Sequence, residues 1–393
     1  MRLPYATAPY VVVPLAAASI VLAGCSGSPH HAASAPADQR PTIDVSVSQC
    51  GTGWTHPTVG HQSFVLHNTD TRGGEVFLSD AKTGAVFAYV EPLGAGTTAA
   101  MSVDLSGGNY AFRCVMQDAD VVVGPTITLT GTAKVVSPSV LPVSQQQMIG
   151  PTKKYEAYVT GRLPALATLV GTLRDDLAHG DLRRARPDWL SAHLAYERLG
   201  AAYGAFGDAD GDINGRPNGL PGGVHDRGFA GFHRIEYGLW HGQSAATLTP
   251  LADGLVAAVA GLRKNFPTAQ IDPTDVAIRA HEITEDALQF ELTGQTDFGS
   301  GSNLATVRAN LDGTEAVLEI LEPLLTTRYT ALPRLTSELA QAQRDLDAQH
   351  HGSTWTPLDR LTRPQRERIN ADISELSELL APIAAICEPR RTS

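Results

Sequence analysis

A histidine and a glutamate stand three residues apart in the stretch GFHRIEYGLW, residues 231–240. If this stretch is helical, His233 and Glu236 project from one face, because residues three apart are neighbours on an α-helix. An imidazole nitrogen and a carboxylate placed in this way suit either a metal site or a polar pair that satisfies itself inside the core. The spacing alone leaves both interpretations open and favours the structural pair.

A second group of polar residues occurs in RAHEITEDALQF, residues 279–290. On a helix, His281 and Glu285 share one stripe, and Glu285 forms an acidic cluster with Glu282 and Asp286 that is repulsive unless solvated or neutralised by a cation. HEITE approaches the H-E-x-x-H pattern of zinc proteases, but Glu285 stands where that pattern has its second histidine. The sequence therefore does not support the zinc-protease mechanism.

Two further carboxylates are candidate ligands. Glu197 lies in AHLAYERLG, where its alternative role is that of a solvent-facing ion-pair partner. Asp210 lies in an Asp- and Gly-rich stretch, residues 207–229, whose alternating aspartates suggest a calcium loop without the closing glutamate of an EF-hand. We expect this stretch to be a connecting loop that lends a carboxylate to a neighbouring site.

The cysteines allow two kinds of site in the first half of the chain. Cys50 and Cys114 lie in that half and are the natural disulfide pair of an exported protein, whereas Cys387 is expected to remain free. Thiolate ligation of a metal is the alternative, although RCVMQDAD lacks the histidine of a blue-copper loop. Glu75 and Glu91 are expected to be either surface charges or part of a second, weak cation site.

The N-terminus predicts export. MRLPYATAPYVVVPLAAASIVLAGCSGS combines an early arginine, a short apolar stretch and small residues before Cys25. VLAGC resembles the lipobox of bacterial lipoproteins, which makes residues 1–24 a signal peptide and Cys25 the lipidated residue; a plain secretory signal is the alternative. Residues 25–41 are rich in Ser, Ala and Pro and are expected to be a flexible tether. No later segment is expected to span a membrane.

Hydrophobic periodicity divides the remaining chain into two regions. Residues 42–136 contain seven short alternating or β-branched stretches separated by turn residues, which predicts an antiparallel β-sandwich. A Pro- and Ser-containing linker, residues 137–151, follows. Residues 152–389 carry apolar positions at three- and four-residue spacing, which predicts an antiparallel helical bundle. The fold class is therefore α+β in separate domains.

Composition excludes one class of partner. The chain of 393 residues is 42% hydrophobic, with a formal net charge of -11 and no basic block along its length. A duplex or single strand of nucleic acid requires a positively charged surface, so nucleic acid is not an expected partner.

The chain resembles the EfeO-type components of bacterial iron-uptake systems. The resemblance is carried by an exported β domain with QC near its start, followed in order by AYERL, GFHRIEYGLW and the acidic EITEDAL helix. The resemblance covers nearly all of the mature chain. It implies a cupredoxin-like domain followed by an imelysin-like, peptidase-related helical domain. It also changes the balance for His233 and Glu236, which the resemblance makes metal ligands.

The resemblance implies a role that is not enzymatic. The protein would be lipid-anchored to the outer face of the bacterial cell membrane, periplasmic or at the cell surface, and would hold iron for delivery to a membrane iron permease, with a haem peroxidase as a second partner. Iron is the implied metal, with zinc or copper as alternatives. The implied ligands in the helical domain are His233, Glu236, Glu197, Glu285 and Asp210, and those of a second cation site are Glu75, Glu91, Cys50 and Cys114.

Two positions depart from the family pattern. The family presents a Tyr-Glu-x-x-Glu helix, which Tyr196 and Glu197 begin, but Gly200 replaces its second glutamate. An Ile-Asp pair of the family is present as Ile213 and Asn214. Because ferric iron favours several anionic oxygens, these departures predict a weakened or retuned site.

Two other functions stay open on the sequence. A surface metallopeptidase is suggested by the peptidase-related name of the helical family, although no nucleophile or second zinc histidine supports it. A module that binds a protein or polysaccharide, with a vestigial metal site, is suggested by the two missing carboxylates.

Overall fold

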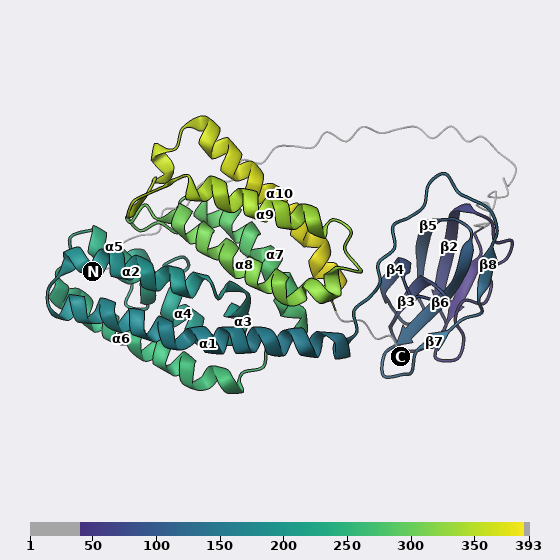
Figure 1. Cartoon of the computed structure of the whole chain (residues 1–393). Coiled ribbons are helices and arrows are strands. Elements are labelled where there is room, and N and C mark those ends of the chain that lie inside the picture. The colour runs from purple at the N-terminus through teal and green to yellow at the C-terminus, as the bar shows by residue number, and fades with distance from the viewer. Residues whose placement is uncertain (1–39, 389–393) are drawn as a thin grey trace, which may run out of the picture. The chain divides into compact units, whose positions relative to one another are not determined.

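The computed structural model describes residues 40–388, which comprise a β region followed by a helical region (Figure 1). This two-part α+β layout confirms the coarse fold prediction. The expected signal peptide, Cys25 and nearly all of the expected tether lie outside the described residues.

The β region consists of two sheets. Each of the seven predicted stretches contains one strand, and one additional two-residue strand is present. The first sheet has the strand order β1–β2–β5 and the second the order β4–β3–β6–β7, with β8 also paired to β6. The strands are β1 Thr42–Val45, β2 Gly60–Asn68, β3 Gly74–Asp80, β4 Val86–Leu93, β5 Thr98–Leu105, β6 Gly108–Met116, β7 Val122–Val123 and β8 Ile127–Leu129.

One shared core joins the two sheets. Alternating residues of β2 and β6 turn inward, so that Phe64 and Phe112 meet with their ring centroids 5.3 Å apart, and Trp54 packs edge-on against both. A disulfide between Cys50 and Cys114 lies in the same core and links the loop after β1 to β6. Apolar burial and one covalent link therefore hold this region together.

The prediction of a wholly antiparallel sandwich was wrong for one pair of strands. β1 pairs with β2 in parallel, with Ile43 opposite Leu66. Parallel pairing requires the chain to cross over before the second strand begins. The chain does so between residues 46 and 59, where it passes through Cys50 and its link to β6.

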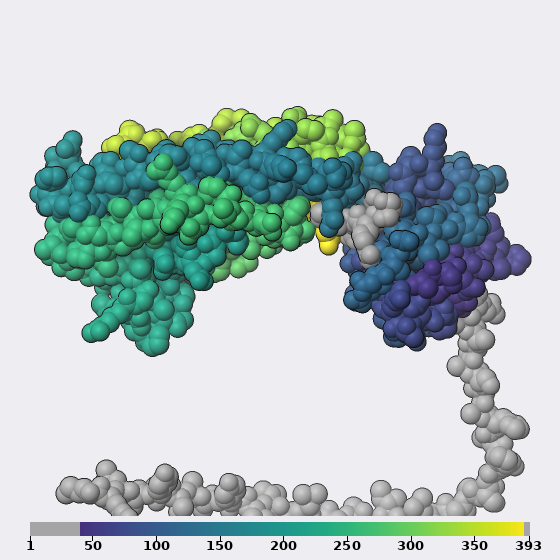
Figure 2. Space-filling view, turned by 90° about the horizontal axis from the view of Figure 1, so that it is seen from below, coloured from purple at the N-terminus to yellow at the C-terminus, as the bar shows by residue number. Residues whose placement is uncertain are grey.

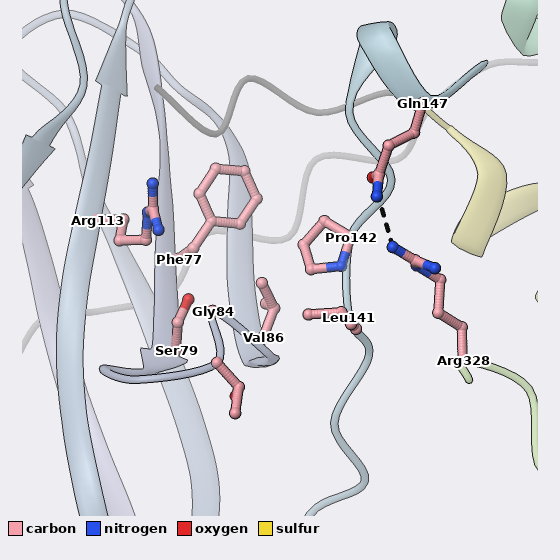
Figure 3. A pocket seen from close by; sticks show the side chains of 10 residues that line it. Phe77, Ser79, Gly84, Val86, Arg113, Leu141, Pro142, Gln147 and Arg328 are labelled. Atoms are coloured by element: carbon pink, nitrogen blue, oxygen red, sulfur yellow. Dashed lines mark hydrogen bonds between the residues drawn. The ribbon is translucent and has the colours of Figure 1, made fainter. Parts of the chain in front are cut away.

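The linker is bound to the β region along part of its length. Val140 and Val86 exchange two backbone hydrogen bonds of 2.7 and 2.9 Å, and Figure 3 shows Leu141 and Pro142 next to Val86. Ser144 then caps a helix in a capping box with Gln147, so the first helix begins inside the range predicted as linker.

Long helices form most of the helical region. Because they contain apolar residues at helical spacing, each buries one side in a common core. They are α1 Gln145–Ala178, α2 Leu182–Glu197, α5 Gly231–Trp240, α6 Ala245–Asn265, α7 Pro273–Asp286, α8 Asn303–Leu325, α9 Leu332–Asp347 and α10 Arg363–Cys387.

α1 organises the first half of this region. Its 34 residues correspond to about 50 Å of helix, and it packs against α2 and α6. Figure 2 shows the teal surface of α1 running beside the green surface of the later helices. α7 packs against α8 and α10, and Arg328 after α8 donates a hydrogen bond to Gln147 of α1 (Figure 3).

The Asp-rich stretch, residues 207–229, was expected to be a connecting loop, but part of it is helical. It begins with a two-turn helix, α4 Asp208–Asn214, which follows the short segments η1 Gly200–Ala202 and α3 Tyr203–Phe206. Asp208 and Asp210 occupy the first turn of α4, where a negative charge stabilises the positive end of the helix dipole.

The expectation that no later segment could span a membrane was wrong by length and composition. Residues Ala245–Thr268 form a helical segment with a mean hydropathy of 1.5, which meets both criteria. Leu248, Leu255 and Val259 of this segment are buried in the helical core. A core helix of a folded domain passes the same test, so the finding is weak evidence for a span.

We predict that removing the disulfide destabilises the β region selectively. Cys50 and Cys114 are 64 residues apart, and the link restricts the unfolded chain, so its loss should cost about 2–4 kcal/mol. Calorimetry of Cys50→Ser/Cys114→Ser should show one unfolding transition at lower temperature and the helical transition unchanged. Cys387→Ala, which leaves the disulfide intact, is the control. Identical thermograms for wild type and the double variant would contradict the prediction.

Candidate functional site

The stretch GFHRIEYGLW forms helix α5, and a glycine at its first position allows the helix to start close to α4. Gly231 has φ +76, and a Cβ atom there would lie 2.2 Å from the carbonyl oxygen of Ile213. Only glycine fits this close approach, which places α5 against the end of α4. His233 and Glu236 are both buried, and Nδ1 of the histidine lies 3.3 Å from Oε2 of the glutamate.

Glu236 also fixes a loop. Its Oε1 atom accepts hydrogen bonds from the backbone N–H of Phe298 at 3.0 Å, the backbone N–H of Ser300 at 3.2 Å and the Ser300 hydroxyl at 2.6 Å. Burial raises the pKa of Glu236 to about 7, although the Ser300 hydrogen bond opposes that shift. Glu236 therefore acts as a structural anchor and as a carboxylate poised to change charge near neutrality.

Helix α2 places a second histidine and glutamate beside the first pair. His193 and Glu197 are buried one turn apart, with Nε2 3.0 Å from Oε1. The ring of His193 lies 5.0 Å from that of Trp189 and 5.3 Å from that of His233. His193 was not among the predicted site residues, although its i,i+4 spacing from Glu197 was a visible signal.

The two histidines have opposite pKa shifts. Burial alone lowers the pKa of His193, but its hydrogen bond to Glu197 and the charge of that residue outweigh burial, so the net shift is upward. Burial and the neighbouring His193 lower the pKa of His233 to about 3. Burial would raise the pKa of Glu197, but its bond to His193 lowers it. His233 is therefore a neutral imidazole, as metal ligation requires.

Helix α4 supplies the third side of the site. The Tyr196 hydroxyl donates to Oδ1 of Asp210 at 2.5 Å, and the Asn214 amide donates to Oε1 of Glu197 at 2.8 Å. Asn310 of α8, with its nitrogen turned towards Glu197, donates to Oε2 at 2.9 Å. The Oδ1 atom of Asn214 is buried and accepts no hydrogen bond, so it is a neutral oxygen available to a cation.

These elements enclose a polar cavity of about 180 Å³. The uncharged residues His233, Asn214 and Asn310 contribute to its wall. The charged residues of the wall are the acids Glu197, Asp210, Glu282, Asp286 and Glu291 and the bases Arg216 and Arg279. With five carboxylates against two guanidinium groups, the cavity attracts cations.

A π-helical turn brings Glu291 to the cavity. The turn η4, Ala287–Glu291, continues α7. The backbone N–H of Leu292 closes it by donating a hydrogen bond of 2.8 Å to the carbonyl oxygen of Ala287. The extra residue per turn changes the direction of the following side chains, and such turns are frequent at functional sites. Burial raises the pKa of Glu291 to about 7, with a further contribution from the charge of Glu197.

The structure does not bring every predicted ligand to the cavity. The side chain of Glu285 is 46% exposed and lies 3.8 Å from Nε2 of His281, outside the wall. In the β region the disulfide engages both cysteine sulfurs, which therefore do not act as thiolates. Glu75 lies on β3 and Glu91 on the adjacent β4, where the ladder is irregular. Within residues 40–388, no group of three or more His, Cys, Asp or Glu side chains is already arranged to hold a metal ion.

The replacement at Gly200 has a direct structural counterpart. A Cβ atom at this position would lie 3.0 Å from Cδ1 of Ile283, which comes from α7. The space in which a glutamate side chain would begin is therefore filled by an apolar side chain. Glu197 is left without a second carboxylate from its own helix.

Comparisons with known proteins identify the family. A profile of the imelysin family, peptidase M75, matches residues 151–383, so the chain belongs to this family. The chain is 25% identical over 349 residues to "Iron uptake system component EfeO" of Yersinia pestis, covering 88% of this chain and 91% of that protein. The protein of the same name from Yersinia pseudotuberculosis, strain IP32953, is 26% identical over 91% of this chain and 94% of its own length. That of Escherichia coli O157:H7 is 23% identical over 88% of this chain and 91% of its own length. The resemblance inferred from the motifs is thereby confirmed.

We predict a pH dependence that comes from Glu236. Its folded pKa of about 7 exceeds the ordinary glutamate value of 4.5, so the folded metal-free protein binds more protons than the unfolded chain between these limits. The contribution of Glu236 to the free energy of unfolding should therefore fall as pH rises from 4.5 to 7, by about 3 kcal/mol, and level off above 7. Urea denaturation at several pH values measures this fall. Glu236→Gln should make the fall shallower and leave the part that comes from Glu291, whose pKa is also about 7, whereas the half-exposed Glu285→Gln should leave the dependence intact. Equal slopes in both variants would overturn the assignment.

Proposed function

We propose that this protein is a lipid-anchored, extracytoplasmic component of a bacterial iron-uptake system that holds iron for delivery to a membrane permease. The observation that carries the proposal is the cavity: a neutral histidine and five carboxylates line one polar space within the region that matches the imelysin family. The names of the similar proteins support iron as the cargo.

The proposed ligands come from four elements. Glu197 of α2, Asp210 of α4, His233 of α5 and Glu291 of η4 line the same cavity, and Glu236 orients His233 from behind. Carboxylate oxygens and an imidazole nitrogen suit iron in either oxidation state, with zinc as an alternative. Glu285 is not included, because its side chain lies outside the cavity wall.

Each of these ligands already has a protein partner, so binding requires rearrangement. Asp210 accepts from Tyr196, and Glu197 accepts from Asn214. An iron ion would replace such bonds and would gain the unpartnered Oδ1 of Asn214. A site that must exchange hydrogen bonds for metal bonds binds more weakly than a preformed cage, which suits a carrier that releases its cargo.

The β region is proposed to be a cupredoxin-like domain that assists docking or loading. Its two-sheet architecture and shared core support this assignment. Glu75 and Glu91, on adjacent strands, are proposed as a second cation site, with copper as an alternative occupant. Cys50 and Cys114 contribute a disulfide to this domain instead of ligands.

The proposed location rests on the N-terminal sequence. The signal of residues 1–24 and the lipobox cysteine Cys25 would anchor the chain to the outer face of the cell membrane, through the tether of residues 25–41. The proposed partners, an iron permease and a haem peroxidase, follow from the family resemblance.

Peptide hydrolysis is the alternative that the family label keeps open. The HEITE segment does not favour it, because His281 lies near the exposed Glu285 and does not line the cavity. Cleavage of an unstructured protein by the metal-loaded chain, lost in Glu197→Gln, would replace the carrier proposal with an enzymatic one.

We predict that cavity carboxylates, and not their exposed neighbour, determine iron affinity. Glu197→Gln and Glu291→Gln each remove one anionic ligand at nearly constant volume, so the dissociation constant for iron should rise by about tenfold or more. Tryptophan fluorescence measures binding, because Trp189 stacks on His193 beside the site. The matched control is Glu285→Gln, for which wild-type affinity is expected. If all three variants bind like wild type, the cavity is not the iron site.

We also predict that restoring a carboxylate at position 214 strengthens the site. In Asn214→Asp, the new carboxylate lies next to Glu197 and repels it in the metal-free protein, which should lower the thermal midpoint. Iron should then bind about tenfold more tightly and raise that midpoint by more than in wild type. Asn218→Asp adds the same charge to the same segment away from the cavity wall and should change neither quantity. Equal affinities in the two variants would contradict the prediction.

A further inference from the structure

The cavity wall includes two arginines, which is unexpected if the site receives a cation alone. Arg216 follows α4, and its guanidinium carbon lies 4.2 Å from the centroid of the Phe290 ring. Arg279 lies on α7, and its Nη1 donates to Glu282 at 2.7 Å. Both positive charges lower the pKa of Asp210, against the larger upward effect of burial, so both act on a proposed ligand. A bound cation would be repelled by them unless an anion intervened.

Arg279 has a donor without an acceptor. Its Nε atom is buried and makes no hydrogen bond, even though Nη1 of the same side chain is paired. A buried N–H that loses its water without gaining a partner is costly, and most such groups in proteins are satisfied. Arg279 forms part of the cavity wall, and its Nε atom lies near Gly204, where a Cβ atom would be 3.6 Å away. A ligand oxygen that reaches this point from the cavity would satisfy the donor.

The donor lies on the helix face that covers the missing carboxylate. Ile283 and Arg279 are one turn apart on α7 and face two glycines of the neighbouring segment. A Cβ atom at Gly200 would lie 3.0 Å from Cδ1 of Ile283, and one at Gly204 would lie 3.3 Å from Nη2 of Arg279. This wall therefore offers a hydrocarbon and a guanidinium group where a glutamate would have supplied oxygens.

We propose that the cavity takes up ferric iron together with a small oxyanion of the size of bicarbonate, held by Arg279 and Arg216. The inference rests on the proposed function and specifies the form of the cargo. Ferric iron favours anionic oxygens, which an oxyanion supplies in place of the carboxylates absent at Gly200 and Asn214. Guanidinium groups bind planar oxyanions through directed N–H donors. The cavity of about 180 Å³ has room for an ion and an anion of a few heavy atoms.

The experiment compares ferric binding with and without the anion. The purified full chain carrying Cys25→Ser is stripped of metal and titrated with ferric ion in bicarbonate-free buffer under argon, and again after addition of bicarbonate, phosphate or citrate. Binding is followed by tryptophan fluorescence. Arg279→Gln and the exposed Arg216→Gln are compared with Arg227→Gln, an exposed arginine of the same segment that does not line the cavity.

We expect bicarbonate to tighten ferric binding by wild type and by Arg227→Gln about tenfold or more. Arg279→Gln and Arg216→Gln should lose this enhancement, yet bind ferric ion in the absence of the anion at least as tightly as wild type, because a repulsive charge is removed. Enhancement by phosphate or citrate but not bicarbonate would overturn the choice of a bicarbonate-sized anion. Wild-type binding that is tight and independent of every anion would overturn the inference and leave the proposed function intact. If wild type binds no iron under any condition, the proposed function fails with it.

Discussion

The fold of the helical region depends on the groups that compensate its buried carboxylates for the loss of water. Burying an ionised carboxylate costs on the order of several kcal/mol unless an opposite charge or hydrogen bonds replace its hydration. Glu197 is compensated by His193 of its own helix and by Asn214 of α4, and Glu236 by Ser300 and the backbone N–H of Phe298. Because the compensating groups come from different elements, these bonds tie α2, α4, α5 and the loop before α8 to one centre.

The same constraint connects folding to the proposed chemistry. The oxygens that an iron ion would use are those that hold the cavity wall together, so a metal bond at Asp210 competes with the hydroxyl of Tyr196. In the described chain no three candidate ligands are already arranged for a metal. Part of the free energy of the proposed metal binding would therefore go into exchanging partners. Affinity that is limited in this way allows a carrier to release its ion when another site offers a better set of ligands.

The sequence predicted the division into two regions and the position of nearly every strand, because alternation with turn residues is a local signal. It also placed His233 and Glu236 side by side on one helix, because a spacing of three depends only on helix geometry, while their role as metal ligands stays a prediction. It selected Glu285 on the same principle, yet Glu285 is not part of the cavity wall, whereas its neighbours Glu282 and Asp286 are. Glu291 reaches the cavity instead, through a π-helical turn for which the sequence carries no recognisable pattern. The parallel pairing of β1 with β2 was equally invisible, because it depends on a contact between distant segments.

The departures at Gly200 and Asn214 raise the question of whether the site is a remnant. A remnant would be free to lose its buried charges, since replacing buried ionic groups by packed apolar side chains is often neutral or stabilising. Of the two positions that depart from the family pattern, only Gly200 has an apolar side chain in place of a buried charge, because Ile283 fills the space beside it. Elsewhere the wall contains Glu197, Asp210 and Glu291, and burial opposes the charged form of each, although the bond to His193 outweighs burial at Glu197. Titratable groups that gather in one cavity and have perturbed pKa values are more typical of a binding site than of a packed core, which favours a retuned binding site over a vestigial one.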